Sequence, residues 1–150
     1  MKKSFFIGLL LCQTSIVTPV LAQVVPQVPP PQVTPLAPAT LAAVMKAMST
    51  NLKKVAAQAQ DVTQNAASEK LVLDLVELTK NSKNHVPDKV KALPKAEQEA
   101  RLQEYIKMLD DMIVVEMELA AAFHNNDNVR ANDMLTKLSA AKKDGHVAFK

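Results

Sequence analysis

Beyond Pro38, apolar residues recur at the three- and four-residue spacing that is typical of amphipathic helices. The first apolar stripe predicts a helix with Thr40 as its N-cap, ending at about Ala59. Its expected inward positions are Leu41, Met45, Met48, Leu52, Val55 and Ala59. A second stripe follows Ser68, and the Asn, Ser, Lys and Pro residues at positions 81–87 end it.

The remaining pattern predicts two more helices. The third begins at Pro94 or Lys95 and continues to about Phe123. Its inward or edge positions are Leu102, Tyr105, Met108, Leu109, Met112, Val115 or Glu116, and Leu119. Turn residues at 125–128 place the start of the fourth near Val129, and its apolar positions are Met134, Leu135, Leu138, Ala141 and Phe149. With short connections and no strand candidates, residues 40–150 are expected to form an all-α, antiparallel up-down-up-down four-helix bundle.

Residues 1–22 have the three-part pattern of a secretory signal peptide. Lys2 and Lys3 precede an apolar run, and Val20-Leu21-Ala22 offers a cleavage point, so the mature chain is expected to begin near Gln23 in the periplasm. A membrane span needs about 20 uninterrupted apolar residues, and polar residues and Pro19 break the run sooner. Lipoprotein processing at Cys12 is disfavoured because Leu11 stands where a small residue is wanted.

Residues 23–39 are rich in proline and contain no charge and no glycine, which predicts a semi-rigid extended tail outside the folded domain. A docking site for a proline-reading module is the alternative. The single cysteine leaves with the signal, so disulfides and thiolate chemistry are excluded from the mature chain. Without Lys2 and Lys3, 16 basic residues face 15 acidic ones, which gives no support for a nucleic-acid partner.

Two residues far apart in the chain are candidate iron ligands. In an up-down-up-down bundle the start of the first helix and the end of the fourth lie at the same end, which brings Met45 and His146 to one level. A thioether and an imidazole can form an axial pair for haem iron. Taken alone, Met45 can be core filler, and His146 can interact with solvent or the helix dipole. Gly145 either marks a fraying terminus or leaves room for a flat ligand.

The segment Met45-Lys-Ala-Met-Ser-Thr-Asn-Leu-Lys-Lys-Val55 resembles the first helix of the soluble cytochrome b562 family, which begins with a ligand methionine followed by an Asn-Leu-Lys step. His146 falls where that family places its ligand histidine. Counting back from it without a gap puts Tyr105 and Leu109 at two aromatic haem-packing positions. Leu109 replaces an aromatic residue, and Lys142 stands in place of an arginine. The resemblance covers roughly residues 41–150.

The resemblance implies a periplasmic electron-transfer protein that binds one non-covalent haem b, because no Cys-x-x-Cys-His motif is present. Met45 and His146 would be the axial ligands, with Met48 as a rival ligand. Two axial ligands leave no open iron position, which favours electron exchange with unidentified redox partners over catalysis. The remaining expected haem contacts are apolar walls at Met48, Leu52, Tyr105 and Leu109, and propionate partners at Lys142 and Lys150.

Other site types have weaker support. His85 and His124 share no obvious face with His146, which argues against a site built from several histidines. The carboxylates at Asp110-Asp111 and at Glu116 and Glu118 lack the Glu-x-x-His repeats of di-iron bundles and read as solvated face charges. No enzymatic constellation can be assembled. The competing hypothesis is a haem-free periplasmic adaptor or stress-related binding protein with Met-rich grooves.

Overall fold

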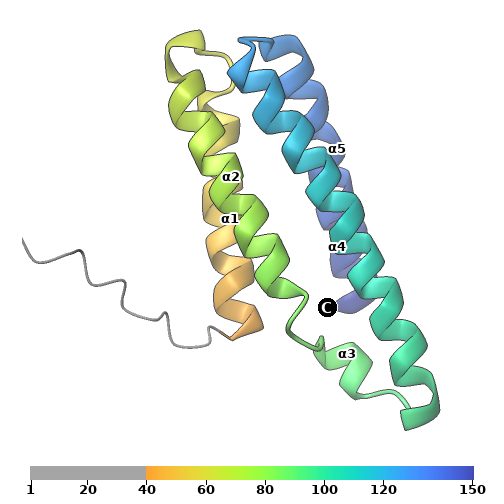
Figure 1. Ribbon diagram of the computed structural model, residues 1–150. Coiled ribbons are helices and arrows are strands. Elements are labelled where there is room, and N and C mark those ends of the chain that lie inside the picture. Colours follow the sequence, from red (N-terminus) through yellow and green to blue (C-terminus); the bar gives the residue numbers. More distant parts are fainter. Residues whose placement is uncertain (1–39) are drawn as a thin grey trace, which may run out of the picture. The chain divides into compact units, whose positions relative to one another are not determined.

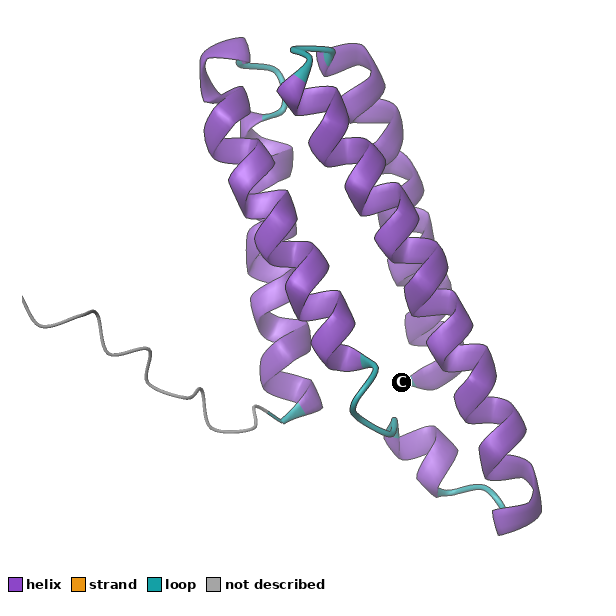
Figure 2. Ribbon diagram, in the orientation of Figure 1, coloured by secondary structure: helices purple, strands orange, loops and turns teal. Residues whose placement is uncertain are grey.

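The computed structural model describes residues 40–150, and every regular element in this range is helical (Figures 1 and 2). The four long helices are α1 (Leu41–Gln58), α2 (Asn65–Ser82), α4 (Lys95–His124) and α5 (Asn128–Phe149). Two short elements, the 3-10 turn η1 (Val62–Gln64) and α3 (Asp88–Lys91), lie in the connections. The predicted signal peptide and proline-rich tail lie outside the described residues.

Side-chain caps fix the starts of several helices, as the sequence predicts. The Thr40 hydroxyl accepts a hydrogen bond from the Ala43 N–H at 3.3 Å, and Asp127 accepts one from the Arg130 N–H at 3.0 Å. The predicted bounds of α1, α4 and α5 are confirmed to within about two residues. Within residues 40–150, no helix combines the length and apolar character needed to cross a membrane.

The segment before α2 differs from the prediction. α2 begins at Asn65 rather than after Ser68, because Asp61 caps the preceding turn through the Thr63 N–H at 2.9 Å and η1 leads directly into the helix. Ser68 is buried inside α2, where its hydroxyl donates to Gln58 Oε1 at 3.2 Å. The short helix α3 was not predicted from the sequence.

The long helices pack in a chain of neighbours. α1 packs on α2, α2 on α4, and α4 on α5, whereas α1 and α5 approach each other much less closely (Figure 1). The connections between α1 and α2 and between α4 and α5 lie at the same end, which we call the turn end. The opposite end, where α1 begins and α5 finishes, we call the open end.

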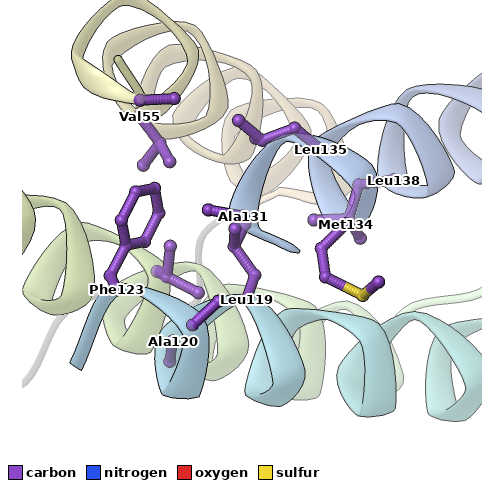
Figure 3. Close-up of a cluster of buried hydrophobic side chains, with 11 residues drawn as sticks. Val55, Leu119, Ala120, Phe123, Ala131, Met134, Leu135 and Leu138 are labelled. Carbon is purple, nitrogen blue, oxygen red and sulfur yellow. The ribbon is translucent and has the colours of Figure 1, made fainter. Parts of the chain in front are cut away.

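The larger apolar cluster joins all four long helices (Figure 3). Val55 of α1 and Val72 of α2 meet Leu119 and Phe123 of α4, and α5 adds Leu138. A smaller cluster contains Val44, Met48 and Leu75. Val44 was missing from the predicted stripe of α1, where Leu41 and Met45 are only partly buried.

Three asparagines connect the two turns at the turn end. Asn65 Nδ2 donates to Asn126 Oδ1 and to Asn128 Oδ1, each at 2.9 Å. Asn128 Nδ2 donates to the Ala59 carbonyl at 2.8 Å. Asn126 adopts a positive φ of 56°, a conformation that asparagine tolerates better than most residues. The hydrogen bonds therefore tie the α1–α2 connection to the α4–α5 connection.

Candidate functional site

The open end contains a cavity of about 710 Å³, within the usual range for small-molecule and cofactor sites. α1, α4 and α5 supply most of its lining, α3 and the residues before it contribute one side, and Leu75 comes from α2. Most of the lining side chains are apolar or carry thioethers. Four methionines are among them: Met45, Met48, Met108 and Met112.

Met45 of α1 and His146 of α5 both line this cavity, although 101 positions separate them in the sequence. Met45 is half-buried. His146 is exposed, because it lies in the last turn of α5, and it also faces a surface groove between α1 and α5. The two candidate ligands therefore reach one cavity from the first and last helices.

The surroundings of His146 favour its neutral form. Partial burial lowers the pKa of the imidazole, and the positive charges of Lys150 and Lys142 lower it further. A neutral imidazole has a free ring nitrogen for coordination. The site thus presents a thioether sulfur and an imidazole nitrogen, a donor set suited to iron in haem or to other soft and borderline metals.

Met48, the rival ligand, differs from Met45 in its surroundings. Its side chain is buried, and its Sδ lies 3.5 Å from the Ser82 hydroxyl, whose single hydrogen has a closer acceptor in the Leu78 carbonyl at 3.0 Å. Leu52, one turn further along α1, is half-buried and lines both the cavity and the surface groove. Met48 is buried in the cluster with Val44 and Leu75, whereas Met45 is only half-buried, so Met45 is the more accessible candidate of the two.

Tyr105 and Leu109, one helical turn apart on α4, are buried in the cavity wall. The Tyr105 hydroxyl donates to the Ser82 carbonyl at 3.3 Å, and burial raises the pKa of Tyr105 to about 12. Its ring meets Phe149 edge-on at 5.2 Å between centroids, and the Arg101 guanidinium lies 4.7 Å over the Phe149 ring. These contacts hold the end of α5 against α4.

Lys142 of α5 and Lys150, the residue that follows α5, line the cavity. Lys142 is half-buried and donates to the Ser49 hydroxyl of α1 at 3.3 Å, whereas Lys150 is exposed. Neither belongs to an ion pair within residues 40–150. Neither ammonium group is therefore neutralised within residues 40–150, although Lys142 already donates one hydrogen bond to Ser49.

Gly145 lies buried within α5, so the expectation of a frayed terminus is wrong. The space that its missing side chain leaves is filled by the end of the Met108 side chain from α4. The other expectation, close approach of a flat ligand at this glycine, requires that flexible thioether to move aside.

Sequence reasoning missed part of the cavity wall. Met108, Met112 and Phe149 were placed on inward faces but not in the site, although they follow Tyr105, Leu109 and His146, respectively, by three residues. For Glu116, the alternative of an inward position is confirmed and the interpretation as a solvated charge is wrong, because its side chain is fully buried and lines the cavity. Its seven-residue spacing from Leu109 on α4 was the available signal.

The other histidines lie apart from the cavity lining. His124 Nδ1 is 3.3 Å from Glu69 Oε1 on the surface near the turn end, and His85 precedes α3. Residues 40–150 contain no cluster of three or more His, Cys, Asp or Glu side chains suited to a metal ion. No family model, curated protein or solved structure matches the chain significantly.

Proposed function

We propose that this chain is a haem b electron-transfer protein of the cytochrome b562 type, built as an up-down-up-down four-helix bundle. The observation that carries the proposal is that Met45 and His146, on the first and last long helices, line one largely apolar cavity. The surrounding thioether and aliphatic walls suit a porphyrin. Because α1 packs only weakly against α5, the side of the bundle between these two helices would admit a flat cofactor.

Each expected contact has a residue in the cavity lining. Met45 and His146 would ligate the iron, with Met48, Leu52, Tyr105 and Leu109 as apolar walls. Lys142 and Lys150 would pair with the propionates at the mouth, where their charges remain hydrated. A bound haem supplies a one-electron couple, and thioether ligation raises its potential. The protein would then provide ligands, shield the macrocycle from water and balance the propionate charge.

Electron transfer is favoured over catalysis because Met45 and His146 would both hold the iron and leave no position open to a substrate. The redox partners would be separate proteins that approach the exposed haem edge. Residues 1–22 support export to the periplasm, where this exchange would take place.

Reconstitution with hemin tests the proposal. The purified chain is expected to bind one equivalent and to give the split visible bands of a low-spin six-coordinate haem on reduction. Met45→Ala and His146→Ala should abolish the low-spin spectrum. Met48→Ala should weaken binding while keeping that spectrum, because the Met48 side chain is buried in the cluster with Val44 and Leu75.

The matched controls substitute one methionine and one histidine that do not line the cavity. Met117→Ala removes an exposed methionine of α4, and His124→Ala removes an exposed histidine near the turn end. Both should bind hemin as the wild type does. A low-spin spectrum that survives in His146→Ala would overturn the ligand assignment. A folded protein that stays colourless with hemin would overturn the haem proposal and favour the adaptor alternative.

A further inference from the structure

Glu116 is a buried acid that the proposed function does not use. Its side chain is 0% exposed, on the inner face of α4, and it lines the cavity. None of the ion pairs within residues 40–150 includes it. Its Oε2 atom has no hydrogen-bond partner in the described part of the chain. A buried carboxylate without a cation is costly, so this position favours the neutral acid.

The Thr79 hydroxyl can hydrogen-bond with Glu116 in either protonation state. Thr79 Oγ1 lies 2.8 Å from Glu116 Oε1 and 3.0 Å from the Leu75 carbonyl oxygen. A threonine hydroxyl carries one hydrogen and can donate only one of these bonds. Both contacts are hydrogen bonds only when Glu116 is protonated, donates to Thr79, and Thr79 donates to Leu75. When Glu116 is ionised, the Thr79 hydroxyl instead donates to the Glu116 carboxylate, and its hydrogen bond to the Leu75 carbonyl is lost.

Glu116 is expected to exchange its proton near neutral pH. Burial raises the pKa of Glu116 to about 7, against a lowering by the hydrogen bond with Thr79. The charged or titratable groups that line the cavity are Lys46 on α1, Asp88 and Lys91 on α3, Tyr105 on α4, and Lys142, His146 and Lys150 on α5, while α2 contributes none. None of them contributes to the pKa shift of Glu116.

An electron that enters this low-dielectric cavity lowers its charge by one and destabilises a nearby carboxylate. Resting on the proposed function, we propose that Glu116 binds one proton from solvent when the bound haem accepts one electron from a redox partner protein, and releases it when the electron leaves. The balance is one electron to the iron and one proton to the Glu116 carboxylate. The Thr79 hydroxyl donates to the Leu75 carbonyl when Glu116 is protonated and to the Glu116 carboxylate when Glu116 is ionised.

Potentiometric titration of the haem-reconstituted protein between pH 5 and pH 9 tests this coupling. The wild-type potential should fall with rising pH near neutrality, with a limiting slope of about 59 mV per pH unit for one proton per electron. Glu116→Gln should remove this slope. The control Glu118→Gln, which removes a partly exposed carboxylate that faces Arg130 at 3.4 Å, should keep it. Thr79→Val should move the sloping region to higher pH, because it removes the bond that lowers the pKa.

Infrared spectra of the haem-free protein give a second readout. The carbonyl band of a protonated carboxylic acid should titrate near neutral pH in the wild type and be absent in Glu116→Gln. If haem binds but the potential of Glu116→Gln keeps the wild-type slope, the coupling is overturned while the proposed function stands. If hemin does not bind, the proposed function and the proton coupling are both overturned. The infrared titration still reports the protonation state of Glu116.

Discussion

The Sδ atom of Met108 lies 2.9 Å from the position that a Cβ atom at residue 145 would occupy, so Met108 and Gly145 share one space between α4 and α5. Alanine in a helix interior is about 1 kcal/mol more favourable than glycine. Here the added methyl would displace the end of the Met108 side chain, and overpacking costs about 1–3 kcal/mol. Gly145→Ala alone should therefore give no net stabilisation.

The same substitution should behave differently when the methionine is removed. In a Met108→Ala background, Gly145→Ala should recover the helix preference and raise the free energy of unfolding by about 1 kcal/mol. Urea denaturation of the two single variants and the double variant measures the coupling energy. Equal effects of Gly145→Ala in the two backgrounds would show that the two residues do not compete for space.

Glu116 should make the folded protein less stable as the pH rises. Its pKa is about 7 in the folded state against 4.5 for the free group, so the folded state holds the proton more tightly. The stabilisation is fully present below pH 4.5, declines between the two values, and is lost above about pH 7. At about 1.4 kcal/mol per pKa unit, the total loss is on the order of 3 kcal/mol.

Urea denaturation at pH 5 and pH 8 measures this loss in the haem-free protein. Glu116→Gln, which cannot ionise, should show a smaller decrease between these pH values than the wild type. Glu118→Gln should follow the wild type, since its side chain is partly exposed on α4. The same pH dependence in wild type and Glu116→Gln would contradict the raised pKa.

The asparagine network at the turn end should contribute measurably to stability. Asn65→Ala removes both hydrogen bonds from Nδ2 and leaves Asn126 and Asn128 without that donor. The expected loss in the free energy of unfolding is about 1–3 kcal/mol. Asn84→Ala, at an exposed position after α2, is the control and should change stability by less than about 0.5 kcal/mol. Equal stability of the two variants would argue against the network.

Tyr105 is the only tyrosine of the chain, and the chain has no tryptophan, so its ionisation can be followed directly by ultraviolet absorbance. Burial raises the pKa of Tyr105 to about 12. Since the phenol of the unfolded chain ionises near pH 10, the folded state should lose stability between pH 10 and pH 12. A phenolate signal that develops near pH 10 in the folded protein would show that the ring is not buried.

The sequence allowed the helices to be predicted because their signals are local. The caps Thr40 and Asp127 and the turn residues around Asn126 mark boundaries that depend only on neighbouring residues. Helix α3 and the early start of α2 were missed. Four residues of α3 are too few to show a period, and the Asp61 cap acts through η1.

The candidate site was predictable only in part. Met45 and His146 could be brought to one end by topology, and the structure places both in one cavity. The role of Glu116 depends on Thr79 of α2, which lies 37 positions away and meets it only after folding. Periodicity alone does not distinguish an inward carboxylate from one on the solvent face when it lies near the border of an apolar stripe.

The weak packing of α1 against α5 bears on how the proposed haem would reach the cavity at the open end. Each of these outer helices rests on an inner neighbour, α2 or α4, and the inner pair packs closely. Separation of α1 from α5 would leave the packing of α2 on α4 and the asparagine hydrogen bonds at the turn end in place. Under the proposed function, haem would therefore enter by local separation of α1 from α5 and without global unfolding.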